Sequence, residues 1–263
     1  MIIWLPLAGL MAAGAGLLIA PLAVRLKGLN LALVSIGIVY IGSYILSNLN
    51  LVTGGAGLGR KTAGYTLFGM NFDNGIEIGT FILTRNQVLY YLGLLVALVS
   101  GIGVKNLIRS KIGRAYAAIR DRDIAAEAIG INLSRFKASA FALSSFYAGI
   151  AGALMFSTIG GVDVERFGLL FSVTFIAIVV IGGVGTVMGP ILGSIFFGLM
   201  PGIIKFGIDH SEFIREGIPL NPAQLERVIF GLFIVGFLIF EPRGIWGIWF
   251  RLRNYFKAWP FSY

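Results

Sequence analysis

The sequence contains no cysteine, a single histidine, and charged side chains at only 13% of its 263 positions. Without cysteine there is no disulfide bond and no thiolate nucleophile, and one histidine is too few for a Cys/His metal site. Soluble domains carry roughly 25% charged residues. The scarcity of charge, together with an apolar fraction of 57%, therefore argues against a soluble protein.

The apolar residues are gathered in long blocks. Four of these contain no Asp, Glu, Lys or Arg: Leu29–Leu49, Val88–Val104, Ala138–Val162 and Gly168–Ile204. A helix needs about 20 apolar residues to cross a hydrocarbon core of roughly 30 Å, so the last block is long enough for two crossings. The first 23 residues lack a positively charged leader, and we expect a true membrane span there rather than a signal peptide.

We therefore predict an all-α, polytopic integral membrane protein with about seven transmembrane helices in one transmembrane domain over residues 1–263. The expected spans are Ile2–Ala23, Leu29–Leu49, Gln87–Ile108, Lys137–Ile159, Gly168–Gly185, Pro190–Ile208 and Glu226–Phe240. Long connections remain over residues 50–86, 109–136 and 209–225. Within the first of them, Ile76–Thr84 is predicted to form a strand.

Under this arrangement about twice as many of the 21 Lys and Arg residues fall on one side of the membrane as on the other. Cytoplasmic loops carry the excess of Lys and Arg. The chain is therefore predicted to begin outside and end in the cytoplasm, with loop 109–136 inside and loops 50–86 and 209–225 outside. The formal charge of +9 is explained by this topology, and we expect no nucleic-acid partner.

No Asp, Glu, Lys or Arg falls in the middle of a predicted span. Proton- and ion-coupled transporters keep such groups there, and membrane enzymes present paired acids or a nucleophile with its base. We therefore expect no enzyme activity. A polar backbone or a sodium site would still permit an ion-coupled carrier, so that alternative stays open. If the protein moves a solute uphill, we expect the energy to enter through another subunit.

The cytoplasmic loop is where such a subunit is expected to dock. Its segment Gly113–Gly130 is rich in the strong helix former Ala and ends at a glycine suited to a left-handed cap, with Ser134 as the cap of the next helix. Small residues there allow close approach of a partner, and charged residues offer polar contacts. A solvated connecting loop is the alternative. The candidate contact residues are Arg120, Asp121, Asp123, Ala125, Ala126, Glu127, Ala128 and Gly130.

Several ordered motifs between residues 110 and 245 resemble the permease of branched-chain amino acid ABC transporters, the LivM type. They are Ser110–Ala115, Ala118–Asp121, Ala125–Asn132, Lys137–Phe141, Gly149–Leu154, Gly182–Thr186, Gly189–Gly193 and Glu241–Ile245. A looser likeness covers Arg25–Leu58. Family members usually begin with further spans, which we expect to be absent here.

The resemblance implies a permease subunit of an ABC importer for branched-chain or related hydrophobic amino acids, in a bacterial or archaeal inner membrane. It implies as partners a sister permease, two cytoplasmic ATPase subunits and an extracytoplasmic substrate-binding protein, with ATP used by the partners and no cofactor on this chain. Ala125, Ala126 and Gly130 match the segment that couples to the ATPase, while Ile124 replaces its usual Glu. A urea or short-amide permease and a non-transporting scaffold remain alternatives.

Two glycine-rich stretches are candidates for the translocation path: Gly54 and Gly55 in the outer loop, and Gly182, Gly183, Gly185 and Thr186 between two spans. Breaks in membrane helices free backbone groups to face a cavity. Close helix packing, as in Gly189-x-x-x-Gly193 and Gly149-x-x-Gly152, or a simple cytoplasmic turn is the alternative. Gly54–Thr62 nearly spells a P-loop, but its Lys comes one residue late and no strand precedes it.

The C-terminal tail mixes cations with aromatic residues directly after the last span. Such a composition is typical of an interfacial anchor whose partners are membrane lipids, anionic ones in particular. The residues concerned are Arg243, Trp246, Trp249, Arg251, Arg253, Tyr255, Phe256, Lys257 and Trp259.

Overall fold

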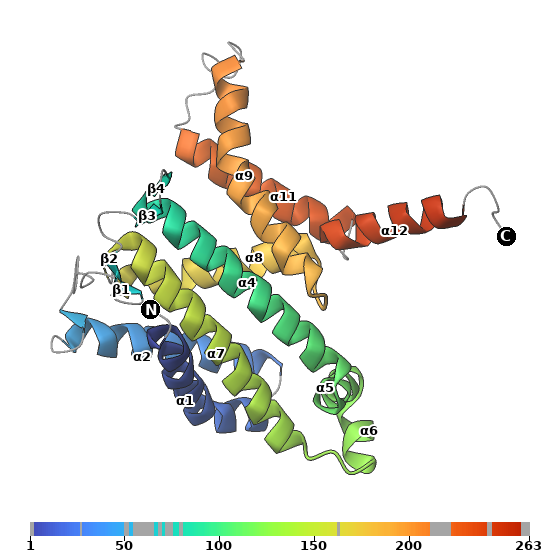
Figure 1. Cartoon of the computed structure of the whole chain (residues 1–263). Helices are drawn as coiled ribbons and strands as arrows, with labels where there is room; N and C mark the ends of the chain where they lie inside the picture. The colour runs from blue at the N-terminus through green and yellow to red at the C-terminus, as the bar shows by residue number, and fades with distance from the viewer. Residues whose placement is uncertain are drawn as a thin grey trace. The chain divides into compact units, whose positions relative to one another are not determined.

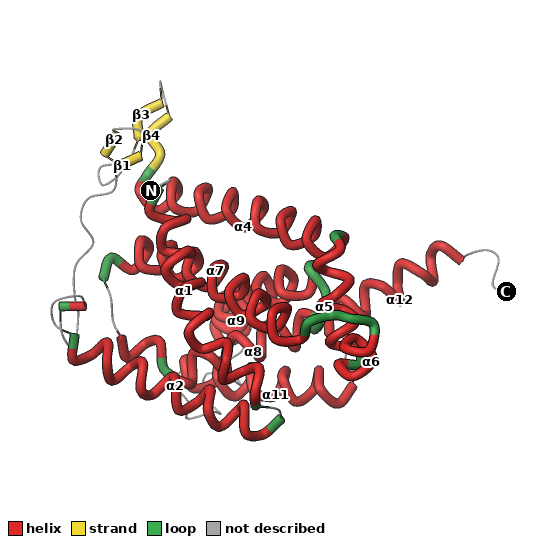
Figure 2. The backbone as a smooth tube through the Cα atoms, turned by 90° about the horizontal axis from the view of Figure 1, so that it is seen from below, coloured by secondary structure: helices red, strands yellow, loops and turns green. Residues whose placement is uncertain are grey.

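The computed structural model describes residues 3–26, 28–49, 53–54, 66–67, 70–71, 76–78, 81–161, 164–210, 222–240 and 244–258. The chain divides into two compact units, Met1–Leu169 and Leu170–Tyr263, each with its own internal contacts. Helices make up almost all of the described part of both units (Figure 2). The predicted all-α class is therefore confirmed.

The first unit is built from helices whose bounds are α1 (Trp4–Arg25), α2 (Leu29–Asn48), α4 (Arg85–Arg109), α5 (Lys111–Asp121), α6 (Asp123–Ala128), α7 (Leu133–Ile159) and the 3-10 helix η1 (Val164–Phe167). Helices α1 and α7 lie side by side (Figure 1). They approach closely because Gly149 leaves room for Ala12, whose Cβ would lie 2.5 Å from a Cβ added at Gly149. The packing role predicted for Gly149 is confirmed, whereas nothing lies within 4 Å of the space beside Gly152.

Four short strands lie before α4. Strand β1 (Thr66–Leu67) pairs with β2 (Met70–Asn71), and β3 (Ile76–Ile78) pairs with β4 (Phe81–Leu83) in antiparallel register, with Ile76 opposite Leu83. The single strand predicted over Ile76–Thr84 is therefore wrong in one respect, because the segment folds into two paired strands. A short connection favours antiparallel pairing of the two strands that it joins, so β3 pairs with β4, the next strand along the chain.

Helix α4 begins at a capping box, in which the side chain of Gln87 accepts a hydrogen bond of 2.9 Å from the backbone N–H of Thr84. At the same end, Nη2 of Arg85 donates to the carbonyl oxygen of Ser157 near the end of α7, at 3.2 Å. A cation beside the last carbonyls of α7 also complements that helix's dipole. The start of α4 is thereby held to the end of α7.

The second unit contains α8 (Leu169–Gly182), α9 (Met188–His210), α11 (Pro222–Phe240) and α12 (Gly244–Ala258). Helices α8 and α9 form a hairpin in which Gly182 meets the backbone of Gly189 and Gly193. Helix α11 returns against α9, where the rings of Phe196 and Phe237 meet edge-on with centroids 6.2 Å apart.

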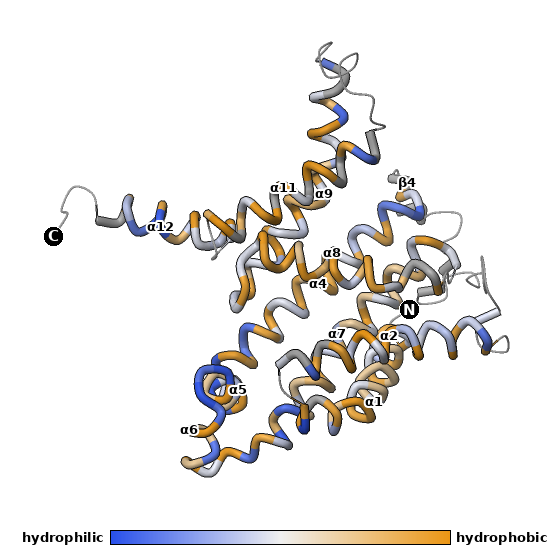
Figure 3. The backbone as a smooth tube through the Cα atoms, turned by 180° about the vertical axis from the view of Figure 1, so that it is seen from behind, coloured by the Kyte–Doolittle hydropathy of each residue, from blue (hydrophilic) through white to orange (hydrophobic). Residues whose placement is uncertain are grey.

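Hydrophobic residues predominate along the long helices (Figure 3), and many of their side chains are exposed. Helix α4 has no buried residue, and α7 buries only Ser157. Water-soluble monomers rarely expose apolar patches of this extent, so these surfaces face lipid. Within the described ranges, four helices are long and apolar enough to cross a membrane, and two shorter apolar helices accompany them. A polytopic helical membrane protein is confirmed, and the figure of seven spans stays a prediction.

Candidate functional site

Helices α5 and α6 form a polar pair that lies between the C-terminal end of α4 and the start of α7 (Figures 1 and 3). Ser110 ends α4 and caps α5, since its side chain donates to the carbonyl oxygen of Leu107 at 2.6 Å and accepts from the N–H of Gly113 at 3.3 Å. A Cβ at Gly113 would overlap the backbone of Leu107 and Ile108. Because position 113 has no side chain, α5 leaves α4 at a sharp corner.

The helix predicted over Gly113–Gly130 is broken at Arg122, which is extended with φ −152° and ψ 103°. Asp123 then starts α6 by accepting from the N–H of Ile124 at 2.9 Å. The prediction for Gly130 is confirmed, because it adopts φ +87° just after α6. The next cap was assigned wrongly: Asn132, rather than Ser134, accepts from the N–H of Arg135 at 3.1 Å. Asn132 lies one position before the first helical residue, where a short acceptor reaches the N3 amide.

The predicted contact residues do not all face outward. Ala126 is 2% exposed, and its carbonyl oxygen accepts from the N–H of Ile131 at 3.0 Å, so it faces the chain itself. Ala125, Ala128, Glu127 and Gly130 are exposed. Ile124 and Ile129 are 80% and 74% exposed on the same short segment. In the sequence, Ile124 stands where the coupling segment usually has Glu, and Ile129 was not among the predicted contact residues. Two isoleucines among small and charged residues are nevertheless a usable signal of a contact surface.

Among the charged candidates, Nε of Arg120 lies 3.2 Å from Oδ1 of Asp121, with both side chains more than two-thirds exposed. Such an exposed ion pair contributes little stability, so Arg120 or Asp121 can readily exchange its present partner for a charged side chain of another protein. The outward face therefore combines two isoleucines, two alanines and re-pairable charges. We call Ile124, Ala125, Ala128 and Ile129 the α6 face.

The helix pair is fastened to α7 through Tyr116. Its hydroxyl lies 2.8 Å from Oγ of Ser139, and its ring meets that of Phe136 edge-on with centroids 5.9 Å apart. The hydroxyl of Ser139 donates to the carbonyl oxygen of Phe136 at 2.9 Å. A serine hydroxyl has one hydrogen, so Tyr116 is the donor and Ser139 the acceptor. Tyr116 therefore joins α5 to the first turns of α7.

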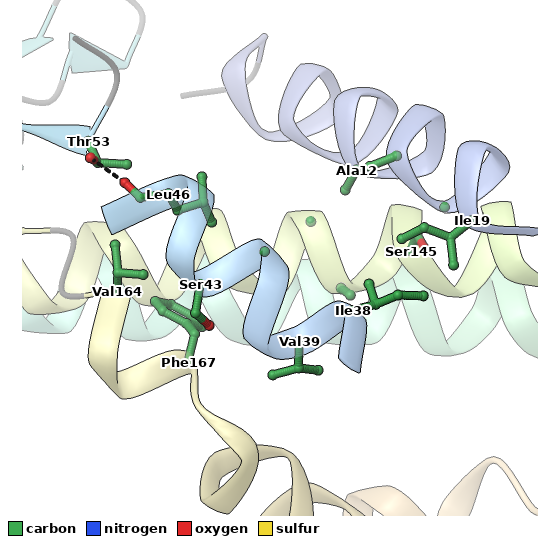
Figure 4. Close-up of a pocket in the computed structure, with 15 residues that line it drawn as sticks. Ala12, Ile19, Ile38, Val39, Ser43, Leu46, Thr53, Ser145, Val164 and Phe167 are labelled. Carbon is green, nitrogen blue, oxygen red and sulfur yellow. Dashed lines mark hydrogen bonds between the residues drawn. The ribbon is translucent and has the colours of Figure 1, made fainter. Parts of the chain in front are cut away.

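Farther along α7 the first unit has an open cavity of about 640 Å³ between α1, α2, α7 and η1 (Figure 4). This volume lies within the range of roughly 300–1,000 Å³ typical of ligand pockets. Its walls are Ala12, Ala15, Gly16, Ile19, Ile38, Val39, Gly42, Ser43, Leu46, Thr53, Ser145, Ala148, Gly149, Val164 and Phe167. None of these lining residues is ionisable, and the hydroxyls of Ser43, Thr53 and Ser145 are the polar side-chain groups.

Thr53 closes one end of this cavity. Its hydroxyl hydrogen-bonds to the carbonyl oxygen of Leu46 at 2.8 Å, near the end of α2 (Figure 4). Gly54 follows with φ +82°, a conformation that favours glycine. The predicted path residue Gly54 therefore adjoins the cavity, while Gly55 lies outside the described residues. The small residues of α1 that form the opposite wall were missed, although Ala12 to Gly16 are all Ala or Gly in the sequence.

The other predicted path residues form the turn between α8 and α9. Gly183 and Gly185 have φ of +122° and +82°, and Oγ1 of Thr186 accepts from the N–H of Gly189 at 2.9 Å. Gly182 and Gly183 are buried against the backbone at the start of α9. These contacts support the alternative of close packing in a tight turn. A role of the turn in solute passage stays a prediction.

Within the described ranges, no group of three or more His, Asp and Glu side chains is placed to hold a metal ion.

Comparison with known proteins gives the family. The family described as "Branched-chain amino acid transport system / permease component" matches residues 1–238. The chain is 32% identical over 226 residues to the high-affinity branched-chain amino acid transport system permease protein LivM of Escherichia coli, covering 81% of this chain and 53% of that protein. Identity to the LivM of Salmonella typhimurium is 31%, with the same coverage.

A probable LivM of the archaeon Methanocaldococcus jannaschii is 24% identical over 165 residues, covering 61% of this chain and 47% of that protein. The chain thus spans about half the length of the curated relatives it matches. No solved structure matches it significantly. The family is defined by transport and not by a catalysed reaction. On the breadth of the family match and the likeness to LivM, the chain belongs to the branched-chain amino acid transport system permease components and is a multi-pass membrane protein.

Proposed function

We propose that this chain is a transmembrane subunit of an ABC importer that carries branched-chain or related hydrophobic amino acids across the inner membrane. The family and the printed function of its LivM relatives support the substrate class. The distribution of basic residues supports a start outside and an end in the cytoplasm. The complete importer would add a sister permease, two ATPase subunits on the cytoplasmic side and a substrate-binding protein outside.

The observation that carries the proposal is the α6 face. Ile124 and Ile129 are 80% and 74% exposed in a segment whose other residues are small or charged and which lies beyond the membrane-crossing helices. Burying one isoleucine side chain fully is worth about 1.5–3 kcal/mol. A short helix that presents two such side chains with small alanines between them suits a groove on a partner protein. In this proposal the groove belongs to an ATPase subunit.

The contacts of α5 provide a route from that face to the cavity. Tyr116 attaches α5 to α7 at Ser139, and α7 contributes Ser145 and Gly149 to the cavity wall. At the other end α5 is fixed to α4 by Ser110 and Gly113. A displacement of α6 by a closing ATPase dimer would thus shift α7 against α1 and α2. Such shear between packed helices is an established way to switch between two states.

The cavity suits an amino acid with an uncharged side chain. Its lining is apolar apart from three hydroxyls, so an aliphatic side chain would be buried without leaving a charged wall residue unpaired. We propose Ser43 and Ser145, on facing helices, as the groups that meet the polar end of the solute. The absence of an ionisable lining residue favours energy input from ATP over coupling to a proton.

The test is purification of this chain from native membranes in mild detergent, followed by reconstitution of the recovered complex with the binding protein. We expect two ATPase subunits and a second permease to co-purify, and labelled leucine to enter the vesicles only with ATP. Uptake that needs an ion gradient and continues without ATP would overturn the proposal in favour of a secondary carrier. A second permease without ATPases, and no uptake, would indicate a non-transporting scaffold. Uptake of urea but not leucine would overturn the substrate class alone.

A further inference from the structure

Helix α12 is amphipathic over its whole length. At 100° per residue, Ile245, Ile248, Trp249, Leu252 and Phe256 fall on one face, with Tyr255 at its edge. Arg251 and Arg253 flank this face, one on each side, and Asn254 lies opposite. Trp246 and Phe250 are the aromatic exceptions, because both fall outside this face, beyond Arg253. An apolar face bordered by arginines is the pattern of a helix that lies in a membrane interface.

The first turn of α12 is fixed to the α8–α9 hairpin. Gly244 has φ +64°, and a Cβ there would lie 2.6 Å from the backbone nitrogen of Gly183 and 2.8 Å from the carbonyl oxygen of Val180. Gly244 and Gly247 are both buried. Beyond this turn the helix reaches past the other helices of its unit (Figure 1). Trp249, for example, is 53% exposed.

The contact at Gly244 also gives the depth of α12. Backbone without regular hydrogen bonds is excluded from lipid-exposed hydrocarbon. Val184 and Gly185, in the turn that joins α8 to α9, are exposed, so we infer that this turn lies at a membrane surface. Since Gly244 touches that turn, α12 starts at the same surface. Its arginines cannot lie deep in hydrocarbon without large cost. The helix therefore runs along the interface, where its exposed apolar face meets acyl chains.

We propose that α12 is an interfacial helix that selectively binds anionic lipid headgroups through Arg251 and Arg253. The chemistry of the helix is complementary to such lipids, because Gly244–Ala258 contains three basic residues and no acidic one. Both arginines are exposed, and their positions on either side of the apolar face direct them to headgroup depth. The contact at Gly244 then links the lipid surface to the α8–α9 turn.

The experiment uses the full chain in lipid nanodiscs with Trp249 as the sole tryptophan, the other three of its four replaced by Phe. Fluorescence quenching is compared between brominated phosphatidylglycerol and brominated phosphatidylcholine at equal mole fraction. We expect both lipids to quench Trp249, with phosphatidylglycerol preferred. Replacing Arg251 and Arg253 by Gln should reduce that preference by about fivefold for each arginine, as expected for one basic residue near an anionic surface.

Two controls keep the result interpretable. Arg120→Gln changes an exposed arginine on the α5–α6 pair and should leave the preference at Trp249 unchanged. Monodisperse size-exclusion profiles check that each variant is folded. If neither lipid quenches Trp249 but aqueous iodide does, the apolar face is exposed to water, either permanently or until a protein partner binds. That result would overturn the proposal. Equal quenching by both lipids would overturn the selectivity for anionic headgroups.

Discussion

Tyr116→Phe is the substitution that most directly tests transmission from the surface helices to α7. It removes the hydroxyl that donates to Ser139 while keeping the ring that meets Phe136 at 5.9 Å. The net contribution of one such hydrogen bond is about 1 kcal/mol, which corresponds to roughly a fivefold change in the equilibrium between attached and detached arrangements. We therefore expect ATP hydrolysis to continue and leucine uptake per ATP to fall by up to about fivefold.

The assay is uptake and phosphate release measured together in vesicles that contain the reconstituted importer. Ser139→Ala removes the acceptor, so the double variant with Tyr116→Phe should lose little more than either single variant. Tyr90→Phe is the matched control, because Tyr90 lies near the start of α4, is 65% exposed, and its ring contacts only Tyr91 among the described rings. Unchanged uptake per ATP in Tyr116→Phe would refute the reasoning, as would simple additivity of the two single variants.

Three further substitutions test other parts of the structure. Ile124→Ser should weaken ATPase binding by about tenfold in a pull-down titration, because an isoleucine contact worth about 1.5–3 kcal/mol is partly lost. As a control, Ile112→Ser changes a side chain on α5 that is 46% exposed, and this variant should bind the ATPase normally. Gly113→Ala should lower the unfolding free energy by about 1–3 kcal/mol through overlap with the preceding backbone, which thermal unfolding in detergent measures. Gly42→Leu should fill part of the cavity and reduce leucine uptake by about tenfold or more. Gly37 lies on the same helix, with equally open space beside it, but does not line the cavity. Gly37→Leu should therefore transport leucine at the parent rate.

The positions of the long helices follow closely from the sequence, because an uncharged run of sufficient length has one low-energy outcome in lipid. The predicted span Leu29–Leu49 and the observed helix Leu29–Asn48 differ at one end by a single residue. Gly130 was likewise predictable, since the positive φ after a helix favours glycine. In these places the local sequence contains the whole reason for the structure.

Features that depend on packing between distant segments could not be predicted in the same way. Ala125, Ala126 and Ala128 are indistinguishable by composition, and only the packing of the folded chain leaves Ala126 buried while the other two are exposed. The cavity requires α1, α2 and α7 to pack in one particular arrangement, which no single stretch of sequence specifies. The break at Arg122 was missed because neither Gly nor Pro marks it.

Ser110 serves both as the C-cap of α4 and as the N-cap of α5, so the corner between them contains no spare residue. One inserted or deleted residue would turn α5 by about 100° about its axis, since a helix has 3.6 residues per turn. Tyr116 would then point away from Ser139. During evolution this corner should accept changes of side chain far more readily than changes of length.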